Sequence, residues 1–155
     1  MSQLVIGSLA PDFELNDVNG RHYRLYDVLA RGPAALVFYK SECPTCQFAL
    51  PFVQKIHEKK GQSAGFTLWG VAENSVEETG KFIQANGLTF DILIDDHPYA
   101  VSAAYALDFV PAIFLIEPNG TIVVSEFGFS KSGLNQIAGF DFFTPKDGLP
   151  SYRPG

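Results

Sequence analysis

The distribution of hydrophobic and polar residues predicts two strands that are buried on both faces. Residues 34–39 (AALVFY) form an apolar run without alternation after a Gly-Pro break, and residues 66–72 form a second run that ends at a charged residue. A short continuous apolar run is typical of a strand covered on both sides. We therefore expect a sheet with the first of these strands near its middle.

Helical spacing alternates with these strands. Residues 44–59 carry apolar side chains every three or four positions, which predicts a helix directly after the first strand. Ser75 and Glu78 match the capping box that opens a helix, expected to end near Asn86-Gly87. Pro98 suits the first turn of a helix that follows a short strand at residues 90–94.

Turn signals place the remaining elements. Asn119-Gly120 separates two strand-like runs, which predicts an antiparallel pair over residues 112–116 and 121–126, and Asn19-Gly20 predicts a similar hairpin near the start of the sequence. Ser132 is a candidate cap for a last helix to residue 138. The pattern predicts one α/β domain over residues 1–155, with a mixed sheet covered by helices on both faces. It does not place the tail at residues 140–155, which is rich in Phe and Pro.

Composition and charge narrow the class of protein. The 155 residues carry a net charge of −6, so a nucleic acid would meet net repulsion. The longest stretches without a charged residue are 12 residues, short of the ~18 that a membrane-spanning helix needs. Because the first residues lack the pattern of a signal peptide, we expect a cytoplasmic protein; an exported protein whose leader is missing from the sequence would look the same.

The cysteine pattern points to thiol chemistry. Cys43 and Cys46 are the only cysteines, which argues against a disulfide framework. A zinc site would need two more ligands, and His22, His57 and His97 form no suitably spaced pair. Two inert cysteines packed as small hydrophobic residues, in a binding or scaffold domain, remain an alternative.

The predicted strand-to-helix junction separates the roles of the two thiols. Cys43 lies at the N-terminus of the expected helix, where free N–H groups and the helix dipole favour a thiolate. Cys46, one turn later, is placed to attack a mixed disulfide, and Pro44 suits the first helical turn. Thr45 offers a hydroxyl of unknown role. Glu42 would raise the pKa of the Cys43 thiol and Lys40 would lower it, so the net direction stays open.

The order strand, C-x-x-C, helix resembles the thioredoxin-like superfamily. Residues 7–15 (GSLAPDFEL) with Asn19-Gly20 resemble the opening of its redoxin branch, which includes TlpA/ResA-type thiol-disulfide oxidoreductases and the AhpC/TSA peroxiredoxins. Residues 110–116 (VPAIFLI) resemble the segment that carries the cis-proline of the superfamily. The resemblance covers roughly residues 4–140 and implies a thioredoxin-like three-layer α/β/α fold with an N-terminal β-hairpin extension.

The resemblance also implies roles. It makes Cys43 the nucleophile, Cys46 the resolving thiol and Pro111 a cis-proline, with the backbone of Val110 presented to an extended substrate. The implied activity is a thiol-disulfide oxidoreductase. Because a cytoplasmic glutathione and thioredoxin pool would hold the cysteine pair mostly reduced, we expect it to act by default as a reductase. It exchanges electrons with protein thiols and disulfides, and a thioredoxin or glutathione system reduces its disulfide again. No cofactor is expected beyond the Cys43–Cys46 disulfide, and the oligomeric state is not implied.

Departures from the family patterns leave questions open. A thioredoxin-dependent thiol peroxidase that reduces hydroperoxides is the alternative activity, but Tyr39 and Cys43 stand where the peroxiredoxin signature has Pro and Thr. The glutamate that TlpA/ResA-type proteins often carry after the second cysteine is replaced by Ala49. The group that takes the proton from Cys46 is therefore open among Glu42, Lys40, Glu73 and water.

Overall fold

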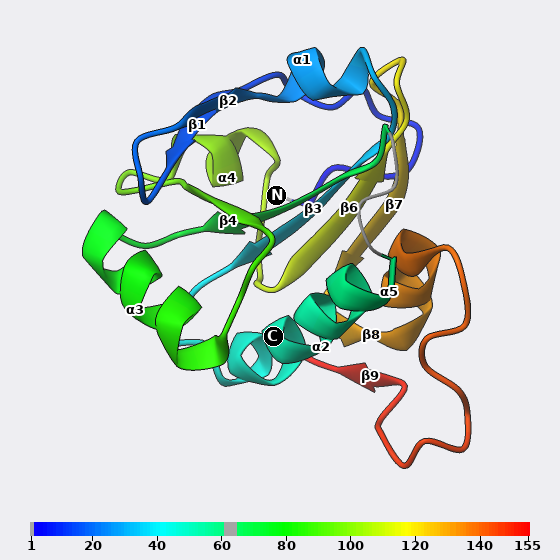
Figure 1. Cartoon of the computed structure of the whole chain (residues 1–155). Coiled ribbons are helices and arrows are strands. Elements are labelled where there is room, and N and C mark those ends of the chain that lie inside the picture. The colour runs from blue at the N-terminus through cyan, green and yellow to red at the C-terminus, as the bar shows by residue number, and fades with distance from the viewer. Residues whose placement is uncertain (1, 61–64) are drawn as a thin grey trace.

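A seven-stranded mixed sheet runs through the molecule in the computed structural model, which describes residues 2–60 and 65–155. Its strands are β1 (Glu14–Asp17), β2 (His22–Arg24), β3 (Ala34–Tyr39), β4 (Thr67–Ala72), β5 (Asp91–Ile94), β6 (Ala112–Ile116) and β7 (Ile122–Phe127). They are arranged in the order β2-β1-β5-β4-β3-β6-β7 (Figure 1). Parallel pairing joins β3 to β4 and β4 to β5, and the other pairs are antiparallel.

Helices cover both faces of the sheet. The helices are α1 (Leu25–Leu29), α2 (Pro44–Lys60), α3 (Val76–Asn86), α4 (Ala100–Ala104) and α5 (Lys131–Ala138). In β3, Val37 and Tyr39 pack into the core with α2, α3 and α5, whereas Leu36 and Phe38 pack with α1 and α4. Successive side chains of a strand point to opposite faces, so burial on both sides explains the unbroken apolar run. The predicted three-layer α/β/α fold is confirmed.

Several local predictions are confirmed. The strand predicted at residues 34–39 has those bounds, and its neighbours β4 and β6 make it an interior strand. Ser75 and Glu78 form both hydrogen bonds of the capping box, and Gly87 ends α3 in the left-handed conformation with φ 60°. β1 and β2 form the predicted N-terminal hairpin, and β6 and β7 pair antiparallel across Asn119-Gly120.

Two predicted helix starts are wrong. α5 is capped by Ser130 rather than Ser132, because the hydroxyl of Ser130 accepts a hydrogen bond from the amide of Gly133 at 3.0 Å. α4 begins at Ala100, so Pro98 lies before it, after a cis His97–Pro98 bond. The carboxylate of the buried Asp95 accepts hydrogen bonds from the amides of Val101 (3.2 Å) and Ser102 (2.8 Å), which holds the helix start beyond the proline.

The tail that the sequence pattern did not place folds back onto the domain. Phe143 is buried beside Phe129, and the side chain of Asn135 binds both the carbonyl (3.0 Å) and the amide (2.9 Å) of Phe143. The tail ends in β9 (Tyr152–Arg153), which pairs antiparallel with β8 (Phe129–Ser130). In Figure 1 the red end of the chain lies next to the start of α2.

The N-terminal residues lie along the outer edge of β7. The amide of Gly7 donates to the carbonyl of Ile122 at 2.8 Å, and the amide of Ile122 donates to the carbonyl of Ser8 at 2.9 Å. Further along, the side-chain amide of Gln3 donates to the carbonyl of Glu126 at 3.0 Å. The backbone at this edge of the sheet is therefore partly paired.

Within the described part of the chain, no helix is both long and apolar enough to cross a bilayer.

Candidate functional site

The two cysteines lie where β3 passes into α2. The amide of Cys43 donates to the carbonyl of Lys40 at 3.1 Å, which closes a turn before the helix. Pro44 is the first residue of α2, as predicted, where a missing N–H costs nothing. Both cysteines are free thiols, with Cys43 half-buried and Cys46 fully buried. Of the two sulfur atoms, only that of Cys43 is open to a substrate.

The sulfur of Cys43 has two polar neighbours. It accepts a hydrogen bond from the amide of Cys46 at 3.3 Å and lies 3.5 Å from the carbonyl oxygen of Val110, to which its S–H donates. An amide at a helix N-terminus can bind the negative charge that a sulfur atom carries when it attacks. The arrangement supports a nucleophilic role for this cysteine.

The environment of Cys46 favours the protonated thiol. Burial raises the pKa of Cys46 well above its ordinary value, and the nearby Cys43 and Glu73 raise it further. A hydrogen bond with the backbone of Lys40 opposes this shift, but burial is the larger effect and disfavours the charged thiolate. Cys46 therefore needs a proton acceptor before it can attack a disulfide.

The loop before β6 faces Cys43. The Val110–Pro111 bond is cis, as the resemblance implied, and Pro111 is buried. The carbonyl of Pro111 accepts a hydrogen bond from the amide of Gly128 at 2.7 Å. Gly128 has φ 76° and approaches residues of β9 closely, which leaves no room for a side chain. This contact fixes the loop so that the carbonyl of Val110 points at Cys43.

Glu73 is the acidic residue whose environment best suits a proton acceptor for Cys46. It follows β4, its side chain is 12% exposed, and the ammonium of Lys40 lies 3.9 Å from its carboxylate. Burial raises the pKa of Glu73, against the opposing effects of Ser102 and Lys40. A carboxylate with a raised pKa exchanges protons more readily near neutral pH. Of the predicted charges, Lys40 and Glu73 are therefore brought together beside the site.

Glu42 is engaged elsewhere. Its carboxylate accepts hydrogen bonds from the side-chain amide of Asn74 at 2.9 Å and from the hydroxyl of Ser41 at 2.7 Å. Asn74 is buried and its carbonyl oxygen also accepts from the amide of Ser41 at 3.0 Å. Asn74 thus fixes the loop before Cys43. This residue was not predicted from the sequence, since a single asparagine after a strand has no distinguishing local pattern.

Thr45 binds a segment that the sequence analysis did not place. Its hydroxyl donates to the carbonyl of Pro154 at 2.6 Å. The guanidinium of Arg153 lies 4.9 Å from the ring centre of Phe48, one turn further along α2. The pairing of β8 with β9 brings these residues to the site, and no local pattern in the sequence predicts such a distant contact.

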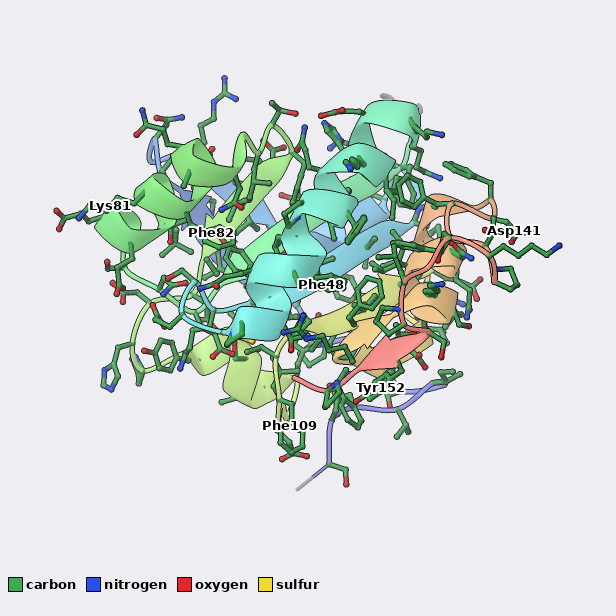
Figure 2. All side chains as sticks on the ribbon, turned by 90° about the horizontal axis from the view of Figure 1, so that it is seen from below. Phe48, Lys81, Phe82, Phe109, Asp141 and Tyr152 are labelled. Atoms are coloured by element: carbon green, nitrogen blue, oxygen red, sulfur yellow. The ribbon has the colours of Figure 1, made fainter. Side chains whose placement is uncertain are left out.

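Exposed aromatic rings flank the loop before β6, which contains Val110 and Pro111. Phe109, Phe127 and Tyr152 are 53%, 45% and 46% exposed, and successive ring centres lie 5.6 and 6.4 Å apart. Figure 2 shows Phe109 and Tyr152 at one edge of the molecule. An apolar surface next to a reactive group is typical of a protein-binding site. Among residues 2–60 and 65–155, no three metal-binding side chains lie together.

Comparisons with known proteins agree with this geometry. The family model of the AhpC/TSA family matches residues 6–125. Thiol-disulfide oxidoreductase ResA of Geobacillus thermodenitrificans is 34% identical over 122 residues, which cover 77% of this chain and 67% of that protein. ResA of Bacillus subtilis is 29% identical over 118 residues, covering 76% and 64%. The chain thus spans about two thirds of the length of these relatives.

Solved structures share the fold. A solution structure from Bacteroides thetaiotaomicron superimposes with a TM-score of 0.81 at 26% identity, covering 90% of this chain and 91% of that one. DsbF of Mycobacterium tuberculosis gives a TM-score of 0.70 at 25% identity, covering 82% and 92%. With the family model matched over most of the sequence, the chain belongs to the AhpC/TSA family.

Proposed function

We propose that this protein reduces disulfides in protein substrates by two successive thiol-disulfide exchanges at Cys43 and Cys46. The observation that carries the proposal is the position of the Cys43 sulfur, which meets the amide of Cys46 on one side and the carbonyl of Val110 on the other. It is the only one of the two sulfurs that a substrate can reach. The named activity of the ResA relatives supports the same chemistry.

The exchange proceeds in two balanced steps. The Cys43 thiolate attacks one sulfur of the substrate disulfide, which breaks the S–S bond, forms a mixed disulfide and releases one substrate thiolate. The thiol of Cys46 then loses its proton and attacks the sulfur of Cys43. This releases the second substrate thiolate and leaves a Cys43–Cys46 disulfide. Two electrons pass to the substrate, whose two sulfurs leave as thiols after protonation.

Glu73 is our candidate for the proton acceptor of Cys46. The raised pKa of Glu73 and its small exposed fraction suit a group that takes a proton in a largely dry environment. Lys40 beside it stabilises the charged carboxylate before the transfer. Proton transfer from Cys46 then lowers the barrier of the second step.

The same proposal includes how the cysteine pair is re-reduced and where the protein acts. A thioredoxin or glutathione system returns the disulfide to two thiols, and no cofactor is needed beyond the cysteine pair. In a reducing cytoplasm, where we place the protein, the pair is held mostly reduced and the enzyme acts as a reductase.

Cys46→Ser tests the assignment. Without the resolving thiol, the first step still runs and the mixed disulfide accumulates, so mass spectrometry of a reaction with a disulfide-containing protein should find the adduct at Cys43. Cys43→Ser is the matched control and should trap nothing. An adduct at Cys46 in the Cys43→Ser variant, or no adduct in the Cys46→Ser variant, would refute these roles. Stopped-flow oxidation of the reduced wild type that is faster with hydrogen peroxide than with a protein disulfide would instead support a thiol peroxidase.

A further inference from the structure

The last residues of the sequence lie across the proposed substrate-binding face. Residues 152–155, called the covering segment below, begin in β9, where Tyr152 pairs with Ser130 and Arg153 with Phe129. They continue to Pro154, whose carbonyl accepts the hydrogen bond from Thr45 at 2.6 Å. Thr45 lies between the two cysteines in the sequence. The covering segment therefore contacts the active-site turn itself.

Gly155 packs against the cis-proline loop. A Cβ atom added to Gly155 would clash with the carbonyl oxygen of Val110 and would lie 3.5 Å from the nitrogen of Pro111. The same carbonyl oxygen lies 3.5 Å from the sulfur of Cys43. Gly155 thus lies against the backbone group that the reactive thiol contacts. A polypeptide that approached Val110 to present its disulfide to Cys43 would meet Gly155 first.

We propose that the covering segment competes with polypeptide substrates for the Val110 backbone and so determines specificity, leaving small disulfides access to Cys43 while excluding protein disulfides until it lifts. The inference rests on the proposed function, because it takes Cys43 as the point of attack and Val110 as the place where a substrate chain lies. The covering segment acts as an internal occupant of that place.

The contacts that hold the covering segment are few. β9 has two residues and, among the strands of the described residues, pairs only with β8, in a sheet separate from the seven-stranded one. Its residues are exposed or half-buried, so its release uncovers little apolar area. Short exposed pairings of this kind open far more readily than a domain unfolds. The covering segment can therefore lift without disturbing the core.

Contacts before the covering segment keep it close after release. Lys131 contacts both the carbonyl of Thr144, at 3.1 Å, and the carboxylate of Asp147. Phe143 is buried and held by Asn135. The tether between Asp147 and Tyr152 is short, and a short tether keeps the local concentration of a bound group in the millimolar range. The covering segment rebinds whenever a substrate leaves.

The test compares the wild type with a chain that ends at Pro150. The measurement is the rate of Cys43–Cys46 oxidation by a protein disulfide, insulin, and by a small one, oxidised glutathione. A competitor that must leave first lowers apparent affinity by the fraction of time the face is open, so we expect the truncated chain to react at least about fivefold faster with insulin. Its rate with glutathione should change by less than about twofold, because Cys43 is only half-buried with the covering segment in place and a small disulfide can reach it there.

A second variant and a free peptide serve as controls for indirect effects of the truncation. Arg153→Ala removes the contact of the guanidinium with Phe48 and leaves Tyr152 in the exposed aromatic surface, so it should shift the insulin rate in the same direction. Lys146→Ala, an exposed position in the same tail, should leave both rates unchanged. The free peptide Ser-Tyr-Arg-Pro-Gly at millimolar concentration should slow the truncated chain with insulin. Circular dichroism checks that each variant is folded.

The outcomes separate the two proposals. If truncation leaves the insulin rate unchanged or lowers it, the covering segment does not compete and this inference is overturned, while the exchange mechanism stands. If neither chain is oxidised by any disulfide, the proposed function itself fails. An equal gain with both substrates would show that the segment shields the thiol rather than selecting the substrate, which also overturns the inference.

Discussion

At the scale of single residues, two thiols three positions apart have opposite environments. Cys43 is half-buried and receives a helix amide, whereas Cys46 is fully enclosed by the core beneath α2. The residue types and spacing predict that Cys43 attacks and Cys46 resolves, because the start of a helix is open and the next turn faces the sheet; this division of roles stays a prediction. They did not predict which charges would lie nearby. Glu42 turns to Asn74, and Lys40 pairs with Glu73.

Selective alkylation checks the difference between the thiols. Because burial raises the pKa of Cys46, iodoacetamide at pH 7 should modify Cys43 more than about tenfold faster. Peptide mapping by mass spectrometry measures both rates in one sample. In the Cys43→Ser variant, Cys46 should react slowly when folded and at an ordinary rate in urea. Equal labelling of both cysteines in the folded wild type would contradict the structure.

Glu73→Gln checks the proton acceptor by two readouts. The substitution removes the acceptor, so release of the mixed disulfide should slow by at least about tenfold while the first attack by Cys43 keeps its rate. Rapid-quench trapping separates the two steps. Glu77→Gln, an exposed carboxylate in α3, is the matched control. An unchanged second step would remove Glu73 from the mechanism.

The pH dependence of stability gives the second readout for Glu73. Its folded-state pKa is raised above the ordinary value of 4.5, so the protonated carboxyl contributes stability that is present below that value. This contribution is lost as the pH rises through the folded-state pKa. Glutamine mimics the protonated form, so Glu73→Gln should raise the Tm at pH 8 relative to the wild type and leave it nearly unchanged at pH 4. A larger gain at pH 4 would have the wrong sign.

At the scale of elements, local patterns predicted the interior strands best. β3 has the predicted bounds because an apolar run between a Gly-Pro break and a charged residue fixes both ends. The starts of short helices were harder, since a cap depends on which hydroxyl the fold turns toward the free amides. α1, with five residues, has too little periodicity to be seen. Asp95 binds amides six and seven residues away, a contact that no cap motif in the sequence shows.

The cap of α5 can be tested directly. Ser130→Ala should lower the free energy of unfolding by about 1 kcal/mol, because the amide of Gly133 loses its partner. Ser132→Ala, at the position that the sequence favoured, should stay within about 0.5 kcal/mol of the wild type. Urea unfolding followed by circular dichroism measures both. A larger loss for Ser132→Ala would restore the original assignment.

At the scale of the whole molecule, the tail is part of the folded unit. Its buried Phe143 packs with Phe52 and Phe129 at ring-centre distances of 5.3 and 5.4 Å. The sequence showed the aromatic residues but not their partners, because the contacts join α2, β8 and a segment without regular structure. Burial depends on this long-range arrangement and not on local spacing. No local pattern in the sequence therefore predicts the position of the tail.

Phe143→Ala measures how firmly the tail is joined to the core. Removing a ring that is 3% exposed should cost about 3 to 5 kcal/mol. Phe140→Ala, whose ring is 41% exposed, should cost less than about 1 kcal/mol. Urea unfolding should show one transition when monitored both by Trp69 fluorescence and by circular dichroism. Two separate transitions would mean that the tail unfolds independently.

The pairing of residues 3–8 with β7 bears on how the protein behaves at high concentration. A sheet edge with free N–H and C=O groups is a template for strands of other molecules, and natural proteins cover such edges. Here the cover is supplied by the N-terminal segment through Gly7, Ser8 and Gln3. Trimming this segment, or straining it with a rigid fusion, would open β7 to its counterpart in a second molecule. Residues 3–8 thus shield the edge of β7 from other molecules, although they lie far from the thiols in the sequence.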